Sequence, residues 1–477
     1  MRYLSPLSAI TLAVITLTAC GGSDDPAPVE ETRVHDTRTS FAPAAPNETT
    51  FAAMAAATGD VTDMSTTSRW KGMLNGAQYQ IEVPPNWNGK LVMYAHGYVG
   101  TINTLVPSMP SIRRYLIQQG YAWAASSYSK NYYDVRAGVE DTNALALAFS
   151  SIAATNSRPL TAPTKTYIIG HSMGGHISAA AIEDETYATA RNKVRYAGAV
   201  PMCGVVGDTE LFDYLGAAQV SAQALAGVPR YPTAGWADIS ALVTSTLYTT
   251  FPSTPTATGL KYKSVLQNLT GGPRPMFDFG LAFGGSFPSA WGSFGGDGTV
   301  NGIFNKAAID TNRFTYVIDG DTAGSATLNT NAQKLTAAAD FNRGRYDGLR
   351  WVPKVNGDFK IPVVSIHTLG DLFVPFSMEQ IYQKRVAAKG NSNYLVQRAI
   401  RGASHCDFTI AEQVNAFADM ITWETTGVKP AGDDVVTAAT VAAPTYGCTH
   451  TVNTRGPDES ATTNALRPNI VALAPCP

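Results

Sequence analysis

The chain has 477 residues, of which 44% are hydrophobic and 15% are charged, so it can form a large core in one domain with an insertion or in two domains. Its formal net charge of −2 implies neither a nucleic-acid partner nor an anionic surface as a target. The sequence has no HExxH motif, paired CxxC motif, P-loop or dinucleotide-binding glycine pattern, and we therefore expect no metal and no cofactor.

The first twenty residues predict an export signal. Arg2 supplies the positive charge, and residues 7–17 form an apolar run too short to span a bilayer. The run ends in Leu17-Thr18-Ala19-Cys20-Gly21, which resembles the bacterial lipobox. This implies a signal peptide over residues 1–19 and a lipid on Cys20; an ordinary signal peptide with an incidental cysteine is the alternative. Because Gly21 replaces the Asp of inner-membrane retention, we expect an outer-membrane anchor, facing the periplasm or the cell surface, as the only membrane contact.

The next segments change from a tether to a sheet. Residues 20–68 are rich in Pro, Ala, Thr, Asp and Gly without periodicity and predict a flexible tether. Residues 78–83 alternate weakly before two prolines, which is typical of an edge strand. The apolar runs 90–95 and 120–126 are typical of strands buried in a parallel sheet, and a helical spacing of apolar residues begins at Asp134.

Residues 164–182 are the most informative stretch. An apolar, β-branched run meets Gly170-His171-Ser172-Met173-Gly174 and continues into an alanine-rich segment. This order predicts a strand, a turn too tight for side chains at its flanks, and a helix. The turn would leave Ser172 exposed at the strand end, with helix N–H groups behind it. A chance G-x-S-x-G is the alternative in a chain with 42 glycines, and the strand and helix context favours the functional interpretation.

The alternation of strands and helices breaks once and then resumes. Residues 195–201 predict a strand, but residues 207–356 are aromatic, rich in Gly and Pro and without alternation. This segment is too long for a loop and predicts a cap subdomain. Strands are predicted again at 361–366 and 393–400, and the helices that follow have the capping boxes Ser377 with Gln380 and Thr409 with Glu412.

These elements predict the α/β fold class, with a doubly wound, mostly parallel sheet and a cap inserted between its sixth and seventh strands. We assign residues 69–206 and 357–428 to the core, residues 207–356 to the cap, and residues 429–477 to a C-terminal tail.

A serine nucleophile needs a base to take its proton and an acid to orient that base. His405 lies in the loop after the last predicted strand and Asp371 in the loop after the preceding one, so both would reach the sheet edge of Ser172. Asp407 is the rival acid, and a simple turn aspartate is the alternative for Asp371. Three histidines fit less well as the base, because they lie in the turn helix, at a strand end before any acid, and in the tail: His176, His367 and His450.

An oxyanion formed at the serine would need two backbone donors. One is the N–H of Met173, directly after Ser172. The loop after residues 90–95 would supply the other, because Gly97 allows a close turn and Tyr98 offers its N–H. His96 opens this loop, and a role in capping the strand end is compatible with that assignment.

Four motifs in this order resemble the successive signatures of the α/β-hydrolase superfamily: Tyr94-Ala95-His96-Gly97, Gly170-His171-Ser172-Met173-Gly174-Gly175, Gly370-Asp371-x-x-Val374-Pro375 and Ser404-His405-Cys406. The resemblance covers roughly residues 76–206 and 358–426 and implies serine-dependent hydrolysis, most often of carboxylic esters. The cysteine after His405 is also similar to the tannase and feruloyl esterase group. His171 stands where that group has the partner cysteine, so the chain departs from its pattern.

Four cysteines remain when Cys20 is lipidated, and an even number in an exported chain predicts two disulfides with three possible connectivities. Cys448 and Cys476 share the tail, where a disulfide would staple it. That leaves Cys203 and Cys406, and we hypothesise that their disulfide holds the His405 loop over the serine.

The sequence therefore predicts an exported serine hydrolase that cleaves a small-molecule or polymeric carboxylic ester through an acyl-enzyme on Ser172. A serine peptidase of the prolyl oligopeptidase type and an inactive binding protein on the same fold are the alternatives. The aromatic cap indicates an apolar pocket with Trp291 as a candidate substrate contact, although these aromatic residues can equally form the cap's own core.

Overall fold

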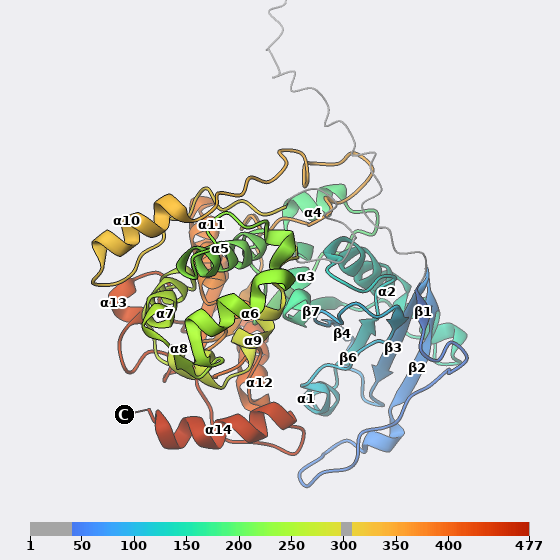
Figure 1. Cartoon of the computed structure of the whole chain (residues 1–477). Coiled ribbons are helices and arrows are strands. Elements are labelled where there is room, and N and C mark those ends of the chain that lie inside the picture. Colours follow the sequence, from blue (N-terminus) through green and yellow to red (C-terminus); the bar gives the residue numbers. More distant parts are fainter. Residues whose placement is uncertain (1–40, 297–307, 477) are drawn as a thin grey trace, which may run out of the picture.

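The computed structural model describes residues 41–296 and 308–476; the predicted signal peptide, Cys20 and the first half of the predicted tether lie outside them. A sheet of eight strands organises the molecule (Figure 1). Its strands follow the order β12 (Leu395–Ile400), β11 (Val363–Thr368), β8 (Gly198–Met202), β7 (Lys165–His171), β4 (Lys90–Ala95), β6 (Ala122–Ser126), β3 (Ala77–Val83) and β2 (Ser68–Leu74).

The sheet is mostly parallel, as predicted. Neighbouring strands from β12 to β6 pair in parallel, whereas β3 pairs antiparallel with both β6 and β2. The prediction that residues 78–83 form an edge strand is wrong, because β2 covers that side of β3. Trp70 is the one fully buried side chain of β2, so this strand lacks the apolar alternation that would have marked it in the sequence.

Helices cover both faces of the sheet. Alternate residues of β4 point to opposite sides, so Leu91 and Met93 join one core cluster while Val92 and Tyr94 join the other. The first face is covered by α2 (Val135–Thr155), α3 (Met173–Ala181) and α11 (Ser377–Ala388), and the second by α1 (Arg113–Gln118) and α12 (Ile410–Thr426). This is the doubly wound arrangement that the buried apolar runs predict.

Between β8 and β11, the sixth and seventh strands of the sheet along the chain, lies a mainly helical insertion. Figure 1 shows its helices, coloured green to yellow, gathered beside the sheet. Its elements are α5 (Glu210–Leu225), α6 (Trp236–Leu247), β9 (Tyr248–Thr250), β10 (Thr254–Pro255), α7 (Ala257–Leu269), α8 (Phe277–Ala282), α9 (Ser286–Gly292) and α10 (Thr322–Asn331). An aromatic cluster fills the space between α6, β9 and α9 and holds this insertion together.

Residues 41–68 contact the core at several points, whereas the sequence predicts a flexible tether for this part of the chain. β1 (Ala42–Pro43) pairs with β5 (Thr104–Leu105). The Phe51 ring lies 5.7 Å from the Trp123 ring, and the carbonyl of Ala52 accepts a 3.0 Å hydrogen bond from Arg113. The composition of this stretch conceals these contacts, because one or two apolar side chains are enough to anchor it.

The C-terminal tail is also docked. It contains α13 (Ala438–Val441) and α14 (Ala461–Leu473). Arg467 of α14 is only 1% exposed and donates a 2.7 Å hydrogen bond to Glu412 of α12, and Cys448 is bonded to Cys476. Within the described ranges, no helix combines the length and the apolar character that crossing a membrane requires.

Candidate active site

The turn between β7 and α3 places Ser172 at the end of the central strands. Ser172 has φ 59° and ψ −120°, a strained conformation for a residue with a side chain. A Cβ on Gly174 would lie 2.0 Å from the Ala95 carbonyl oxygen, and a Cβ on Gly170 would lie 2.2 Å from that of Gly174. Only glycine therefore fits at either position, which is the physical reason for the G-x-S-x-G pattern.

The structure brings Ser172, His405 and Asp371 together in one hydrogen-bonded chain. The Ser172 Oγ lies 2.8 Å from His405 Nε2, and His405 Nδ1 lies 2.5 Å from Asp371 Oδ2. The second oxygen of Asp371 accepts hydrogen bonds from the N–H groups of Phe373 at 2.9 Å and Val374 at 3.0 Å. Because Asp371 is fully buried and held at both oxygens, it fixes the orientation of the imidazole.

Asp407, the rival acid, interacts with groups other than His405. Asp407 accepts a 3.2 Å hydrogen bond from the N–H of Ala403 and lies 3.8 Å from Arg467. Its neighbour His405 points instead toward Asp371, as expected for adjacent residues of a loop.

Two histidines beside the serine are neutral, His171 half-buried and His176 fully buried. Burial lowers the pKa of His171 to about 4, and this ring lies between the Tyr94 hydroxyl at 3.2 Å and Gln413 at 3.0 Å. Burial likewise lowers the pKa of His176 to about 4; its Nδ1 lies 2.7 Å from the Tyr133 hydroxyl and its Nε2 lies 2.8 Å from the Pro353 carbonyl. Both rings are structural partners of the turn rather than bases for Ser172.

The predicted oxyanion loop lies directly against the serine. A Cβ on Gly97 would lie 3.2 Å from the Ser172 Cβ and 3.8 Å from its Oγ, so Gly97 leaves the space in front of the hydroxyl open. Tyr98 lines the same cavity as Ser172, and Met173 is the first residue of α3, where backbone N–H groups lack helical acceptors. His96 stacks on the Tyr128 ring at 4.1 Å, and its carbonyl accepts a 3.0 Å hydrogen bond from the Tyr128 hydroxyl.

A disulfide ties the His405 loop to the sheet. Cys203, directly after β8, is bonded to Cys406, and both residues have positive φ angles, 44° and 58°. The N–H of Cys203 donates to the Ile366 carbonyl at 2.8 Å, so the bridge is anchored to β11 as well. Cys203, Cys406 and His405 offer metal-ligating atoms within 4.8 Å, but both sulfurs are used in the disulfide.

Ser172 opens into a cavity of about 390 Å³. Among the residues that the structure describes, no charged side chain lines it, and its wall combines the turn, the loop after β11 and the helical insertion. The lining residues include Tyr98, Thr101, Tyr133, Val205, Leu211, Phe212, Leu215, Ser289, Ser293, Phe294, Phe373 and Val374. The sequence did not point to most of these lining residues. Phe373 was the easiest of them to predict, because it follows Asp371 by two positions.

Trp291, the predicted substrate contact, is not among the described residues that line this cavity. It is 9% exposed and packs against Trp236, Phe287 and Phe294 at ring distances of 5.2, 5.8 and 5.1 Å. The alternative interpretation, an aromatic core of the insertion, describes its position.

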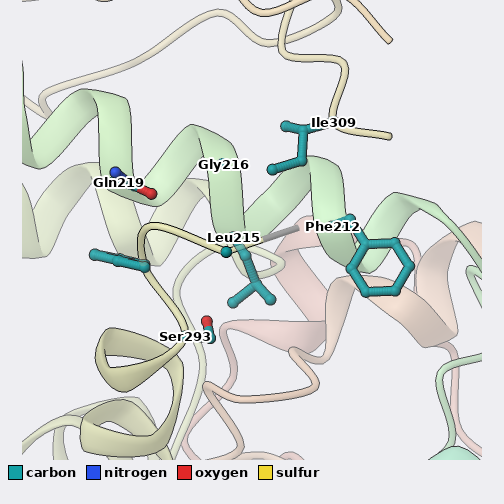
Figure 2. A pocket seen from close by; sticks show the side chains of 8 residues that line it. Phe212, Leu215, Gly216, Gln219, Ser293 and Ile309 are labelled. Atoms are coloured by element: carbon teal, nitrogen blue, oxygen red, sulfur yellow. The ribbon is translucent and has the colours of Figure 1, made fainter. Parts of the chain in front are cut away.

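A small recess adjoins the cavity beside α5. Figure 2 shows it with the side chains of Phe212, Leu215 and Ser293 on one side and Ile309 on the other. It has a volume of about 10 Å³ and shares five lining residues with the larger cavity: Phe212, Leu215, Ser293, Phe294 and Gly296. Leu215 is therefore part of the wall between the two spaces.

No family model matches the chain. An o-phthalyl amidase from Xanthobacter agilis is 32% identical over 76 residues, which are 16% of this chain and 17% of that protein, so the match spans about a sixth of the curated relative.

Among solved structures, a feruloyl esterase B from Aspergillus oryzae is 14% identical with a TM-score of 0.40, covering 76% of this chain and 82% of the other. The closed-state lipase A of Candida antarctica is 15% identical with a TM-score of 0.35, covering 85% and 86%.

The fold class follows from the molecule itself. The strand order, the two antiparallel strand pairs at one end of an otherwise parallel sheet and a serine on the turn after the fifth strand define the α/β-hydrolase fold. The acid and the histidine follow the seventh and eighth strands, at the same edge of the sheet.

Proposed function

We propose that this protein is an exported serine hydrolase that cleaves uncharged carboxylic esters through an acyl-enzyme. The observation that carries the proposal is the hydrogen-bonded chain Ser172–His405–Asp371 at a cavity whose described lining residues carry no charge. Export and lipid anchoring rest on the sequence of residues 1–21 alone.

The geometry supports a two-step reaction. The Ser172 hydroxyl attacks the ester carbonyl while His405 Nε2 takes its proton, and Asp371 stabilises the resulting imidazolium. The N–H groups of Met173 and Tyr98 would hold the oxyanion. His405 then gives the proton to the leaving alcohol, and a water molecule activated by the same nitrogen releases the acid and restores the serine.

The cavity favours an uncharged acyl or aryl group. An unpaired charge within it would lose its hydration without meeting a counter-charge on the lining residues. The rings of Phe212, Phe294 and Phe373 offer apolar contacts, and Thr101 and Ser289 add polar side chains to the lining.

Amide hydrolysis is the second candidate, favoured by the 76-residue similarity to the o-phthalyl amidase. The test is a panel of p-nitrophenyl esters and p-nitroanilides with matched acyl groups, together with aminoacyl p-nitroanilides. We expect the esters to have the highest kcat/KM. A preference for the matched anilides would assign an amidase, and a preference for aminoacyl anilides would assign a peptidase. No turnover and no labelling by a fluorophosphonate would indicate a binding protein.

Replacing Leu215 with alanine is expected to lengthen the preferred acyl chain. The change would join the recess of Figure 2 to the main cavity. We expect kcat/KM for an octanoyl ester to rise about tenfold relative to a butanoyl ester, the scale of one or two methylene groups in an apolar pocket. Leu211→Ala is the control, because Leu211 lines the cavity but not the recess. An equal shift in both variants would contradict the role of Leu215 as a dividing wall.

A further inference from the structure

A second buried pair of acid and imidazole lies next to Asp371, and the mechanism above does not use it. His367 belongs to β11 and Glu379 to the first turn of α11, and both are at most 1% exposed. His367 Nδ1 lies 3.4 Å from Glu379 Oε1, and His367 Nε2 lies 3.8 Å from Asp371 Oδ2. The imidazole is therefore enclosed between two carboxylates.

One oxygen of Asp371 faces both imidazoles. Asp371 Oδ2 lies 2.5 Å from His405 Nδ1 and 3.8 Å from His367 Nε2. A charge on His367 would thus act on the same atom that orients His405, at a distance where a buried pair interacts strongly.

The two ring nitrogens of His367 face oxygen atoms. Nε2 lies 2.8 Å from the Val374 carbonyl oxygen, which can only accept, so Nε2 carries a proton. Nδ1 has no hydrogen-bond partner of good geometry, but it lies 3.4 Å from Oε1 of the Glu379 carboxyl group. Burial lowers the pKa of His367, but the neighbouring Glu379 and Asp371 outweigh it, and the pKa lies above its ordinary value.

The other ionisable groups nearby do not replace this charge. Arg274 is the second cation near Asp371; burial lowers its pKa to about 10, and its Nε donates to the Leu369 carbonyl at 2.7 Å. Burial raises the pKa of each tyrosine around the two carboxylates, so these remain neutral: Tyr214, Tyr382 and Tyr446. Among the described residues near His367, the charges are thus two carboxylates, one guanidinium and the imidazolium itself.

We propose that His367 is a positioning residue of the Ser172 site: as an imidazolium between Glu379 and Asp371, it holds the carboxylate that orients His405 and offsets part of its negative charge. The inference rests on the proposed serine hydrolase function. His367 acts through Asp371, because His367 is not among the residues that line the cavity.

The test compares two histidine-to-glutamine variants in the pH dependence of kcat/KM for a short-chain p-nitrophenyl ester. His367→Gln keeps a donor toward Val374 but loses the positive charge. His405 then takes up a proton more readily, so the acid limb of the profile moves to higher pH by about 0.5 to 1 unit. His176→Gln is the matched control, because His176 is likewise buried but neutral, and both of its ring nitrogens are hydrogen-bonded. The acid limb of the His176→Gln profile should stay at its wild-type pH, even if the variant has a lower rate.

An unmoved limb in His367→Gln, with a rate lowered equally at every pH, would overturn the proposal and leave His367 a packing residue. Should this variant not fold, nitrogen-15 NMR of the wild type and of Glu379→Gln gives the answer. We expect two protonated ring nitrogens on His367 near pH 7.5 in the wild type and one in Glu379→Gln. A neutral His367 in the wild type would also overturn the proposal. Failure of the wild type to turn over any ester would instead contradict the proposed function, and the NMR result would not depend on it.

Discussion

Replacing Ser172 with alanine is expected to lower ester turnover by roughly 10⁴- to 10⁶-fold, the loss typical of removing a nucleophile from such a triad. The substitution removes one oxygen atom and leaves the backbone conformation at position 172 unchanged, so the fold should persist. Initial rates with a short-chain p-nitrophenyl ester, together with circular dichroism and the melting temperature, check both expectations.

Ser178→Ala is the matched control for this variant. Ser178 lies in α3, the helix that follows Ser172, and its hydroxyl donates to the Gly174 carbonyl at 2.7 Å instead of to His405. Losing that bond costs on the order of 1 kcal/mol of stability, and turnover should fall by less than about tenfold. A Ser172→Ala variant with a rate near that of Ser178→Ala would refute the nucleophile.

The second large effect is expected from Asp371→Asn, which should lower kcat by about 10³- to 10⁴-fold at neutral pH. The asparagine oxygen can keep the hydrogen bonds from Phe373 and Val374. Its NH₂ group would then face His405 Nδ1 and select the imidazole tautomer that presents a proton, rather than a lone pair, to Ser172. Steady-state kinetics and the rate of fluorophosphonate labelling should fall together.

Asp407→Asn separates this effect from a general loss of buried charge. Asp407 is 1% exposed and lies 3.8 Å from Arg467. Its replacement weakens the docking of α14, so the melting temperature should fall while kcat stays within about tenfold of the wild type. A larger loss of kcat in Asp407→Asn than in Asp371→Asn would make Asp407 the acid.

The capping boxes show where local sequence suffices and where it does not. Thr409 and Glu412 form the predicted box at the start of α12. Ser377 and Gln380 do not form one, because Ser377 is already inside α11 and its N–H donates to Thr270, while Gln380 donates to the Gly271 carbonyl. Both partners are in the insertion, so contacts distant in sequence replaced the local cap.

The edges of the domain show the same difference between what local sequence predicts and what it does not. The buried apolar strands were predictable because helices cover both faces of the sheet, so the side chains on both sides of each strand must be mostly apolar. β2 and residues 41–68 were not, because their contacts involve few apolar side chains, such as Trp70 and Phe51, and depend on where the rest of the sheet ends.

The sequence by itself determined the turn around Ser172, because Gly170 and Gly174 are required by close backbone contacts that occur in any such strand–turn–helix. It also determined which loops carry Asp371 and His405, since parallel strands all end at one edge of the sheet. Only the tertiary structure decided the cavity lining, the place of Trp291 in an aromatic core, and the enclosure of His367 between two carboxylates. These depend on how side chains from distant segments pack, and no local pattern specifies that.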